Sequence, residues 1–183
     1  MAQTVTNVTA AKPVVGGAVS VAATTATLPT STGTTLGSGW TGLGYISEDG
    51  LTNNNTPESE TIKAWGGDIV LTPVSGKEDT FTFTLIEAIN VDVLKVIYGS
   101  SNVSGTLGSG ITVNAKADEM DAHAWCIDMV LRNNVAKRIV IPNGVISEVG
   151  EIAYTDGDAV GYEVTVTAFP NSSGVTHYEY MKS

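Results

Sequence analysis

The clearest pattern in the chain is a strict alternation of apolar and polar side chains over residues 80–85. Phe81 and Phe83 fall on one side of an extended strand, and threonines fall on the other. The same alternation recurs over residues 111–115 and 162–168, so we predict half-buried antiparallel strands at all three places. Apolar, β-branched or aromatic residues predict further strands at 14–21, 43–47, 62–65, 122–131, 139–141, 145–146 and 175–180.

One helix is predicted, at about residues 90–98. Asn90 is a good N-cap, Asp92 suits the positive end of the helix dipole, and Gly99 can end the helix in the left-handed conformation. Because this segment carries an apolar stripe, we expect the short helix to pack over the opening of a sheet. The stripe consists of Val91, Leu94, Ile97 and Tyr98.

Turn-forming residues punctuate the predicted strands. Residues 48–50, Glu-Asp-Gly, begin a turn, and the asparagines and the proline that follow extend it into a protruding polar loop over about residues 49–59. The Pro-Asn-Gly sequence at residues 142–144 predicts a second turn, which separates the strands at 139–141 and 145–146.

Two regions follow from these patterns. Residues 1–40 are rich in Thr, Ala, Val, Ser and Gly and have almost no charge, so we expect a flexible or extended N-terminal arm that orders against its own domain or a neighbouring subunit. Residues 41–183 are expected to form a single domain. About nine or ten strands and one short flanking helix predict a mainly β fold, an antiparallel β-sandwich or barrel. Its open sheet edges must be hidden, charged or used.

Charge argues against binding of nucleic acid. The 183 residues include 19 acidic residues and 9 Lys or Arg, which gives a formal net charge of −10. An acidic surface repels phosphate backbones unless a local basic patch compensates. The nearest candidate patch is Arg132, Lys137 and Arg138, and these three cations are interpreted as solvated strand ends.

The remaining composition sets further limits. Cys126 is the one cysteine, so an internal disulfide is excluded, and its apolar neighbours indicate a small buried side chain. The N-terminal residues lack the basic start and uninterrupted apolar run of an export signal, and no run of 18 apolar residues predicts a membrane-spanning helix.

Candidate chemical sites are weak. Asp118, Glu119, Asp121 and His123 cluster in the sequence as a metal site would, but no second ligand set accompanies them. Asp156 and Asp158 flank a glycine as in a calcium loop, yet the other oxygen ligands of such a loop are missing. Solvated turns are favoured in both places. We therefore expect no catalytic residue, no metal site, no cofactor and no enzymatic activity.

Three segments carry a resemblance to a known family. They are Gly44-Tyr45-Ile46-Ser47-Glu48-Asp49-Gly50, Ile62-Lys63-Ala64-Trp65-Gly66-Gly67-Asp68, and the strand with Phe81, Phe83, Leu85, Ile86 and Glu87 that runs into Val91, Leu94, Lys95 and Gly99. Together they resemble the major tail protein, or tail tube protein, of long-tailed, non-contractile bacteriophages. The strand around Trp125 and the Asp156-Gly157-Asp158 turn before a strand at 162–169 agree with the general layout.

This resemblance implies a structural virion protein. Its subunits would form hexameric rings that stack into the tail tube, through which genomic DNA leaves the capsid. The loop at about 49–59 and mobile termini would reach into the adjacent ring. The implied partners are further copies of the chain, the tape measure protein, the tail terminator and the distal tail protein, with DNA passing through the lumen without specific binding. The implied location is the virion, after synthesis in the bacterial cytoplasm.

Two other functions remain open on the residues alone. A monomeric surface-adhesion or carbohydrate-binding β-sandwich would share the Thr, Val and Gly composition and would expose an aromatic platform. Its conceivable members are Tyr154, Tyr162, Tyr178 and Tyr180. A hydrolase would need a nucleophile and a base within reach of each other, and the sequence offers no recognisable pair. The size of the purified protein at rising concentration distinguishes assembly from a monomeric binding module.

Overall fold

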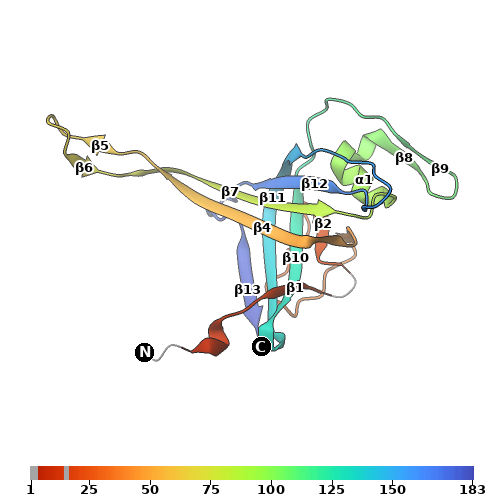
Figure 1. The fold of residues 1–183 in the computed structure, drawn as a ribbon, viewed down its shortest axis with the longest axis horizontal. Coiled ribbons are helices and arrows are strands. Elements are labelled where there is room, and N and C mark those ends of the chain that lie inside the picture. Colours follow the sequence, from red (N-terminus) through yellow and green to blue (C-terminus); the bar gives the residue numbers. More distant parts are fainter. Residues whose placement is uncertain (1–3, 15–16) are drawn as a thin grey trace.

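The structure is a computed structural model that describes residues 4–14 and 17–183. Within these residues it has thirteen strands, one α-helix and three short 3₁₀ segments (Figure 1). The strands are β1 Ala11–Pro13, β2 Val19–Ala23, β3 Thr41–Gly42, β4 Ile46–Ser59, β5 Ile62–Lys63, β6 Ile69–Leu71, β7 Val74–Leu85, β8 Val103–Thr106, β9 Gly110–Val113, β10 His123–Leu131, β11 Ala136–Val149, β12 Tyr162–Ala168 and β13 Tyr178–Lys182. The helix is α1, Val91–Tyr98. The predicted mainly antiparallel β fold with one flanking helix is confirmed.

One large antiparallel sheet organises the domain. Its strands follow the order β3-β2-β10-β11-β12-β7-β4, and β1 and β13 pair with β10 and β11 outside this path. Strand β11 belongs to both halves of the sheet, because its first residues pair with β13 and its last residues pair with β12. Figure 1 shows that β4, β7 and β12 run across the direction of β10, β11 and β13. The folded sheet therefore encloses an apolar core, as the two layers of a sandwich do.

The predicted turn at residues 142–144 is wrong, because β11 continues through it. The pairing with β10 shifts here: Ile141 faces Trp125, and Gly144 faces His123, so β11 carries one extra residue. Such a bulge accommodates a proline inside a sheet. A Cβ on Gly144 would lie 2.9 Å from Trp125 Cδ1, and Trp125 Nε1 donates a hydrogen bond of 3.0 Å to the Gly144 carbonyl oxygen. Any larger residue at position 144 would therefore crowd the Trp125 ring, so glycine allows the close packing here.

The core contains the residues that the alternation predicts. Phe81 and Phe83 of β7 are buried, together with the apolar side chains of β12. Phe83 meets Trp125 edge to face, with ring centroids 6.0 Å apart. The ambiguous segment 122–131 is strand β10, and the alternation over 162–168 is strand β12. Large apolar side chains from separate strands therefore meet in one cluster.

Helix α1 lies at one end of the sheet beside the small β8–β9 hairpin (Figure 1). The Asn90 side chain accepts a hydrogen bond from the Asp92 backbone N–H, as its N-cap position predicts. Gly99 has a φ of 89° but a ψ of 139°, so the expected left-handed helical ending is wrong, although the positive φ still suits glycine. The buried face differs from the predicted stripe, because Val91 and Tyr98 are only partly buried. The buried residues are Val93, Leu94, Val96 and Ile97.

The N-terminal region, expected to be an arm that orders against its own domain or a neighbouring subunit, contributes two strands to the sheet of its own domain. Strand β2 pairs with β10 inside the sheet, and its Val19 and Val21 side chains are buried. Strand β1 pairs with the other end of β10, on the sheet surface. Residues 19–23 therefore belong to the folded domain, because their apolar side chains complete its core. Part of the strand predicted at 14–21 lies outside the described residues, and the division of the chain at residue 40 stays a prediction.

Candidate assembly surfaces

A long hairpin projects from the sheet (Figure 1). Strand β7 pairs with β12 only up to Thr80, so its residues 74–79 pair with β4 alone, and β5 and β6 continue the hairpin to its tip. The predicted loop at 49–59 is therefore wrong as a loop, although the region does protrude: it is most of β4. Two strands of an arm pair through backbone hydrogen bonds and need no alternation of apolar and polar side chains. For this reason the polar sequence of β4 does not predict a strand.

Glycines shape both ends of this hairpin. Gly50 has a φ of 76° and lies where the pairing of β4 with β7 shifts between Ile46 and Leu51, so the predicted Glu-Asp-Gly turn is a bulge. Gly66 and Gly67, at the tip, have φ values of 119° and 101°, which L side chains adopt only with strain. The Gly-Gly pair thus permits the tight reversal at the tip.

The outer part of the hairpin exposes apolar side chains. Trp65, at the tip, has a relative exposure of 108%, so no part of the folded chain covers its indole. The other exposed apolar side chains here are Ile62, Ile69, Val70, Leu71 and Val74. A bare two-stranded hairpin is marginally stable in water, and exposed apolar groups that cluster mark interaction surfaces. This part of the hairpin is suited to contact with another protein surface.

The base of the hairpin is fixed by a buried carboxylate. The Asp79 side chain on β7 is fully buried and accepts hydrogen bonds from Asn53 Nδ2 of β4 at 2.9 Å and from the Thr176 hydroxyl. His177 Nδ1 lies 2.6 Å from the same carboxylate, and Lys77 Nζ lies 4.0 Å away. The hairpin is therefore joined to the segment that precedes β13.

The Asp79 cluster predicts a dependence of stability on pH. Burial raises the pKa of Asp79, but hydrogen bonds from Thr176, Asn53 and His177 and the nearby His177 charge outweigh it, so the pKa lies below its ordinary value of 3.8. A lowered pKa stabilises the fold above the unfolded value and loses that effect as the pH falls through the folded value. Urea unfolding should therefore show Asp79→Asn destabilised at pH 6, with a smaller difference from wild type at pH 3.

A matched control for this prediction is Asp156→Asn, which changes an exposed carboxyl group. We expect it to have the same stability as wild type at both pH values. A difference between wild type and Asp79→Asn that is constant or grows towards acid pH would contradict the role given to the ionised Asp79.

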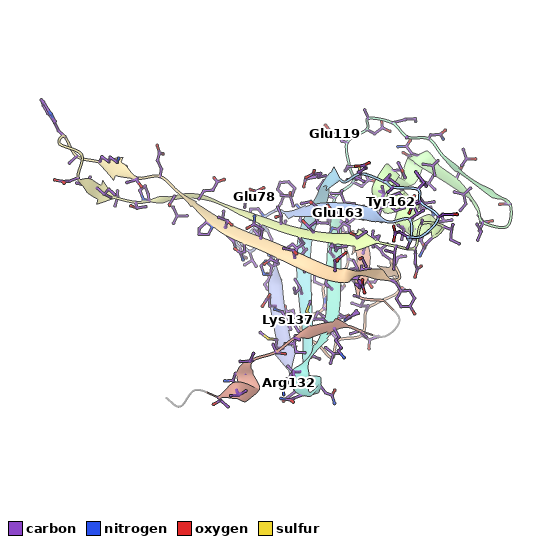
Figure 2. The ribbon with its side chains drawn as sticks, viewed as in Figure 1. Glu78, Glu119, Arg132, Lys137, Tyr162 and Glu163 are labelled. Atoms are coloured by element: carbon purple, nitrogen blue, oxygen red, sulfur yellow. The ribbon has the colours of Figure 1, made fainter. Side chains whose placement is uncertain are left out.

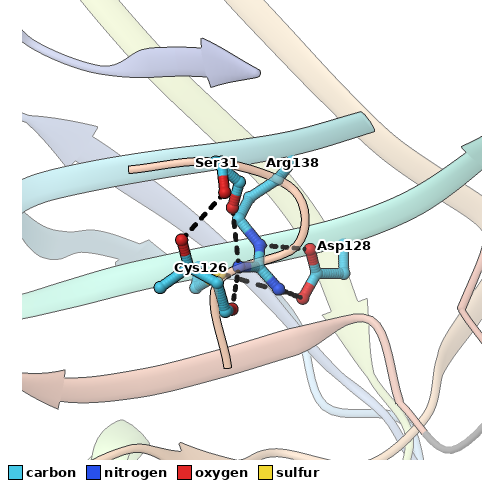
Figure 3. A network of polar contacts seen from close by, with 5 residues as sticks. Ser31, Cys126, Asp128 and Arg138 are labelled. Atoms are coloured by element: carbon cyan, nitrogen blue, oxygen red, sulfur yellow. Dashed lines mark hydrogen bonds and ion pairs between the residues drawn. The ribbon is translucent and has the colours of Figure 1, made fainter. Parts of the chain in front are cut away.

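Of the three cations interpreted as solvated strand ends, Arg132 is exposed, whereas Lys137 and Arg138 form ion pairs within the fold. Arg138 is buried, and its guanidinium donates two hydrogen bonds to Asp128, of 2.6 and 2.9 Å (Figure 3). Its Nη1 also donates to the backbone oxygens of Ser31 and Thr34, at 3.0 and 2.6 Å. Lys137 pairs with Glu179 at 2.9 Å. Arg138 thus holds the 24–40 loop against the sheet, a role that the local sequence does not signal.

Cys126 lies beside this network (Figure 3) and is buried, as predicted. Burial, with a smaller contribution from the Asp128 carboxylate, raises the pKa of its thiol to about 12. The reactive thiolate is therefore scarce at neutral pH, and the side chain packs as a small apolar group.

Loss of the Arg138 guanidinium should destabilise the protein. Arg138→Met leaves Asp128 without its partner and removes two anchors of the 24–40 loop, and we expect a loss of about 2 to 4 kcal/mol in the free energy of unfolding. Lys137→Met is the control, because its surface ion pair is worth about 1 kcal/mol or less. Urea unfolding and limited proteolysis within residues 24–40 measure both effects. Equal stability of the two variants would contradict the anchoring role.

One face of the sheet is rich in hydroxyl groups and acids. On β4, β7, β12 and the end of β11, threonine is the most frequent residue among the side chains opposite the core, and two lateral bonds join hydroxyl groups: Thr82 to Thr165 at 3.1 Å and Thr167 to Ser147 at 2.8 Å. The same face carries Glu58, Glu78, Glu148 and Glu163, two of which are labelled in Figure 2. By strand register, none of its described positions is Lys or Arg.

The acidic clusters singled out in the sequence have structural contacts. Asp118 accepts a hydrogen bond from Asn102 Nδ2 at 2.9 Å, and Asp121 accepts one from the Ser100 hydroxyl at 3.4 Å. Asp156 and Asp158 lie in an exposed bend. Among the residues that the structure describes, no three His, Cys, Asp or Glu side chains are grouped to hold a metal ion. The expectation of no catalytic, cofactor or metal site stays a prediction.

The four tyrosines considered as a sugar-binding platform do not share one exposed surface. Tyr162 is buried in the core, whereas Tyr154 is exposed. Tyr178 and Tyr180 stack on β13 with ring centroids 6.3 Å apart. These positions favour packing roles for Tyr162, Tyr178 and Tyr180.

These observations define an antiparallel β-sandwich protein with a long projecting hairpin, an exposed apolar tip and open sheet edges. In a comparison with protein families, the model of a phage tail tube protein family matches residues 6–182. The chain therefore belongs to the phage tail tube protein family, and the resemblance found in the sequence is confirmed. A comparison with curated proteins gave no significant match. In the described part of the chain, no helix has the length and apolarity to cross a membrane.

Proposed function

We propose that copies of this chain assemble into stacked rings, with six copies in each ring, to form the phage tail tube. The exposed hairpin is the observation that carries this proposal. Its apolar side chains and its two-stranded build require a covering surface, and contact with a subunit of the adjacent ring supplies one. Membership of the tail tube family supports a structural role rather than a catalytic one.

The sheet edges support lateral contact within a ring. Strand β4 has 14 residues and pairs with β7 on one side only, so its other edge presents unpaired backbone groups. An open edge of this length favours pairing with another chain. Edge pairing between neighbouring copies joins their sheets, and a head-to-tail contact of this kind closes into a ring when its rotation allows.

We propose that the hydroxyl-rich face with its four glutamates lines the lumen. A wall without Lys or Arg forms no ion pairs with DNA phosphates, so DNA passes without specific binding. The tape measure protein, the tail terminator and the distal tail protein are the proposed partners besides further copies of the chain. The proposed location is the virion, after synthesis in the host cytoplasm.

The assembly proposal is tested by size. Purified protein at rising concentration should form rings or tubes, seen by light scattering and negative-stain microscopy, because contact between copies covers the hairpin. A species of 19.0 kDa at every concentration would contradict the proposal and favour a monomeric binding module.

The lumen proposal is tested by the access of thiol reagents to Glu163→Cys, since Glu163 is exposed on this face. In tubes, a small maleimide should react and a bulky polymer-linked maleimide should not, because only the small reagent diffuses through the bore. The unassembled variant should react with both, and the buried Cys126 should react with neither. Reaction of the bulky reagent along assembled tubes would place this face outside, and failure of both reagents would place it in a contact between subunits.

A further inference from the structure

A groove lies between β1 and the start of β4, with β10 as its floor. Its lining is largely apolar and includes Pro13, Ala18, Ile46, Leu51, Ile127 and Met129. Its volume is about 240 Å³. Its charged residues are Glu48 and Asp49 from the bulge in β4, Lys12 of β1, and Asp128 of β10, which is already paired with Arg138.

The groove matches the tip of the hairpin in size. An apolar cavity of about 150 Å³ holds a benzene ring, so a groove of about 240 Å³ can accept the larger indole of a tryptophan. Trp65 is the fully exposed aromatic side chain at the tip. Buried aromatic anchors of this kind commonly carry most of the binding energy of an interface.

The charges of the two surfaces are also complementary. Lys63 lies two residues before Trp65, and Glu48 lies at the groove. Within the part of the chain that the structure describes, neither side chain has an ion-pair partner. Contact between tip and groove would give each of them one, which favours the correct orientation of the partner.

The two surfaces lie at opposite ends of the same hairpin. The groove uses the first residues of β4, whereas the tip lies beyond the last residues of β4, at the turn between β5 and β6 (Figure 1). One chain therefore cannot fill its own groove with its own extended hairpin. A contact between two different surfaces of the same protein repeats from copy to copy and generates an open filament when it does not close.

We propose that this groove receives Trp65 of a second copy of the chain, with Lys63 of that copy beside Glu48. The inference rests on the proposed tube assembly and names the surface that covers the hairpin tip. It also makes the contact directional: each copy gives one tip and receives another.

A second hollow competes for the tip. It has a volume of about 530 Å³ and is lined by residues 86–90 and Val160. Its carboxylate, Glu87, already accepts hydrogen bonds of 3.0 Å from the Tyr45 backbone N–H and from Asn90 Nδ2. Glu87 is therefore engaged within the chain, and the groove with Glu48 is the better receptor for Lys63.

A charge exchange tests the pairing in the full-length chain. Lys63→Glu and Glu48→Lys should each lower the amount of assembled protein at a given concentration at least tenfold, and the double exchange should restore most of it. Thermal unfolding of each unassembled variant should match wild type, because both side chains are exposed. Failure of the double exchange to restore assembly would overturn the proposed pair.

Crosslinking locates the contact directly. The variant with both Lys63→Cys and Glu48→Cys, assembled and oxidised, should give a ladder of covalent oligomers on a denaturing gel. A one-to-one mixture of the two single variants should give dimers alone, since each chain then carries half of the contact. Cys126 does not interfere, because it is buried.

The control pairs Lys63→Cys with Ile89→Cys, at the exposed edge of the competing hollow. Crosslinks to residue 89 in place of residue 48 would overturn the groove as the receptor. If wild-type protein forms tubes but the double-cysteine variant gives no crosslink between residues 63 and 48, the groove is also overturned as the receptor. Tube assembly itself would then still stand. A wild-type chain that stays monomeric at every concentration would contradict the assembly proposal itself.

Discussion

A variant in which residues 60–73 are replaced by an Asn-Gly turn is expected to fold normally and to form no tubes. Ser59 and Val74 are paired neighbours on β4 and β7, so a two-residue turn can join the strands there. The removed segment contains the exposed apolar tip and no residue of the core cluster. Thermal unfolding should therefore stay within a few degrees of wild type, while light scattering and negative-stain microscopy should show a monomer.

Trp65→Ala is the smaller version of the same experiment. We expect a large loss of assembly, because exposed aromatic anchors of this kind carry much of the binding energy of an interface. The unfolding temperature should not change, since the indole is fully exposed in the isolated chain. Leu107→Ala is the control, because it shortens another exposed apolar side chain, on the turn between β8 and β9. Tubes of normal length from the shortened hairpin would remove the tip from the assembly mechanism.

The largest effect on stability is expected at Phe81. Its ring is fully buried on β7 and meets His177 edge to face, with centroids 5.2 Å apart. Truncation to alanine removes this contact and leaves a cavity, and the expected loss is about 3 to 5 kcal/mol in the free energy of unfolding. For a domain of this size that loss corresponds to a fall of roughly 6 to 20 °C in the melting temperature. Urea and thermal unfolding measure both quantities.

Thr80→Ala provides the comparison for Phe81→Ala. Thr80 lies on the same strand with its side chain on the opposite face, so its removal should change stability by about 0.5 kcal/mol or less. Phe83→Ala should behave like Phe81→Ala, because Phe83 packs against Trp125. If the Thr80 and Phe81 variants were equally stable, the assignment of the two faces of β7 would be wrong.

The sequence predicts the parts of the fold whose side chains are divided between core and solvent. The alternation in β7 and β12 and the N-cap residue of α1 reflect the environment of each side chain, and these elements are confirmed. The same alternation also extends to a polar residue. Asp79 lies two residues before Phe81, so the register that buries Phe81 also buries Asp79, and the cluster at the base of the hairpin was predictable in outline.

The remaining features depend on contacts between distant parts of the chain. Strand β4 is polar because little of it has a core beneath it, and no local pattern separates such a strand from a loop. The turn signal at 142–144 is overridden because Gly144 must lie against Trp125. Arg138 is buried by a loop about a hundred residues away, which supplies carbonyl oxygens that the sequence around Arg138 does not reveal.

The buried Asp79 has a mechanical consequence. Three stretches of chain meet at its carboxylate: β4 through Asn53, β7 itself, and the C-terminal segment through Thr176 and His177. A force applied at the tip of the hairpin is therefore transmitted to the rest of the domain at this point. Thr176 and His177 directly precede β13, and β13 pairs with β11. The force therefore passes into the middle of the sheet. Before Thr80, β7 pairs with β4 alone, so we expect bending to be concentrated in this two-stranded outer part of the hairpin.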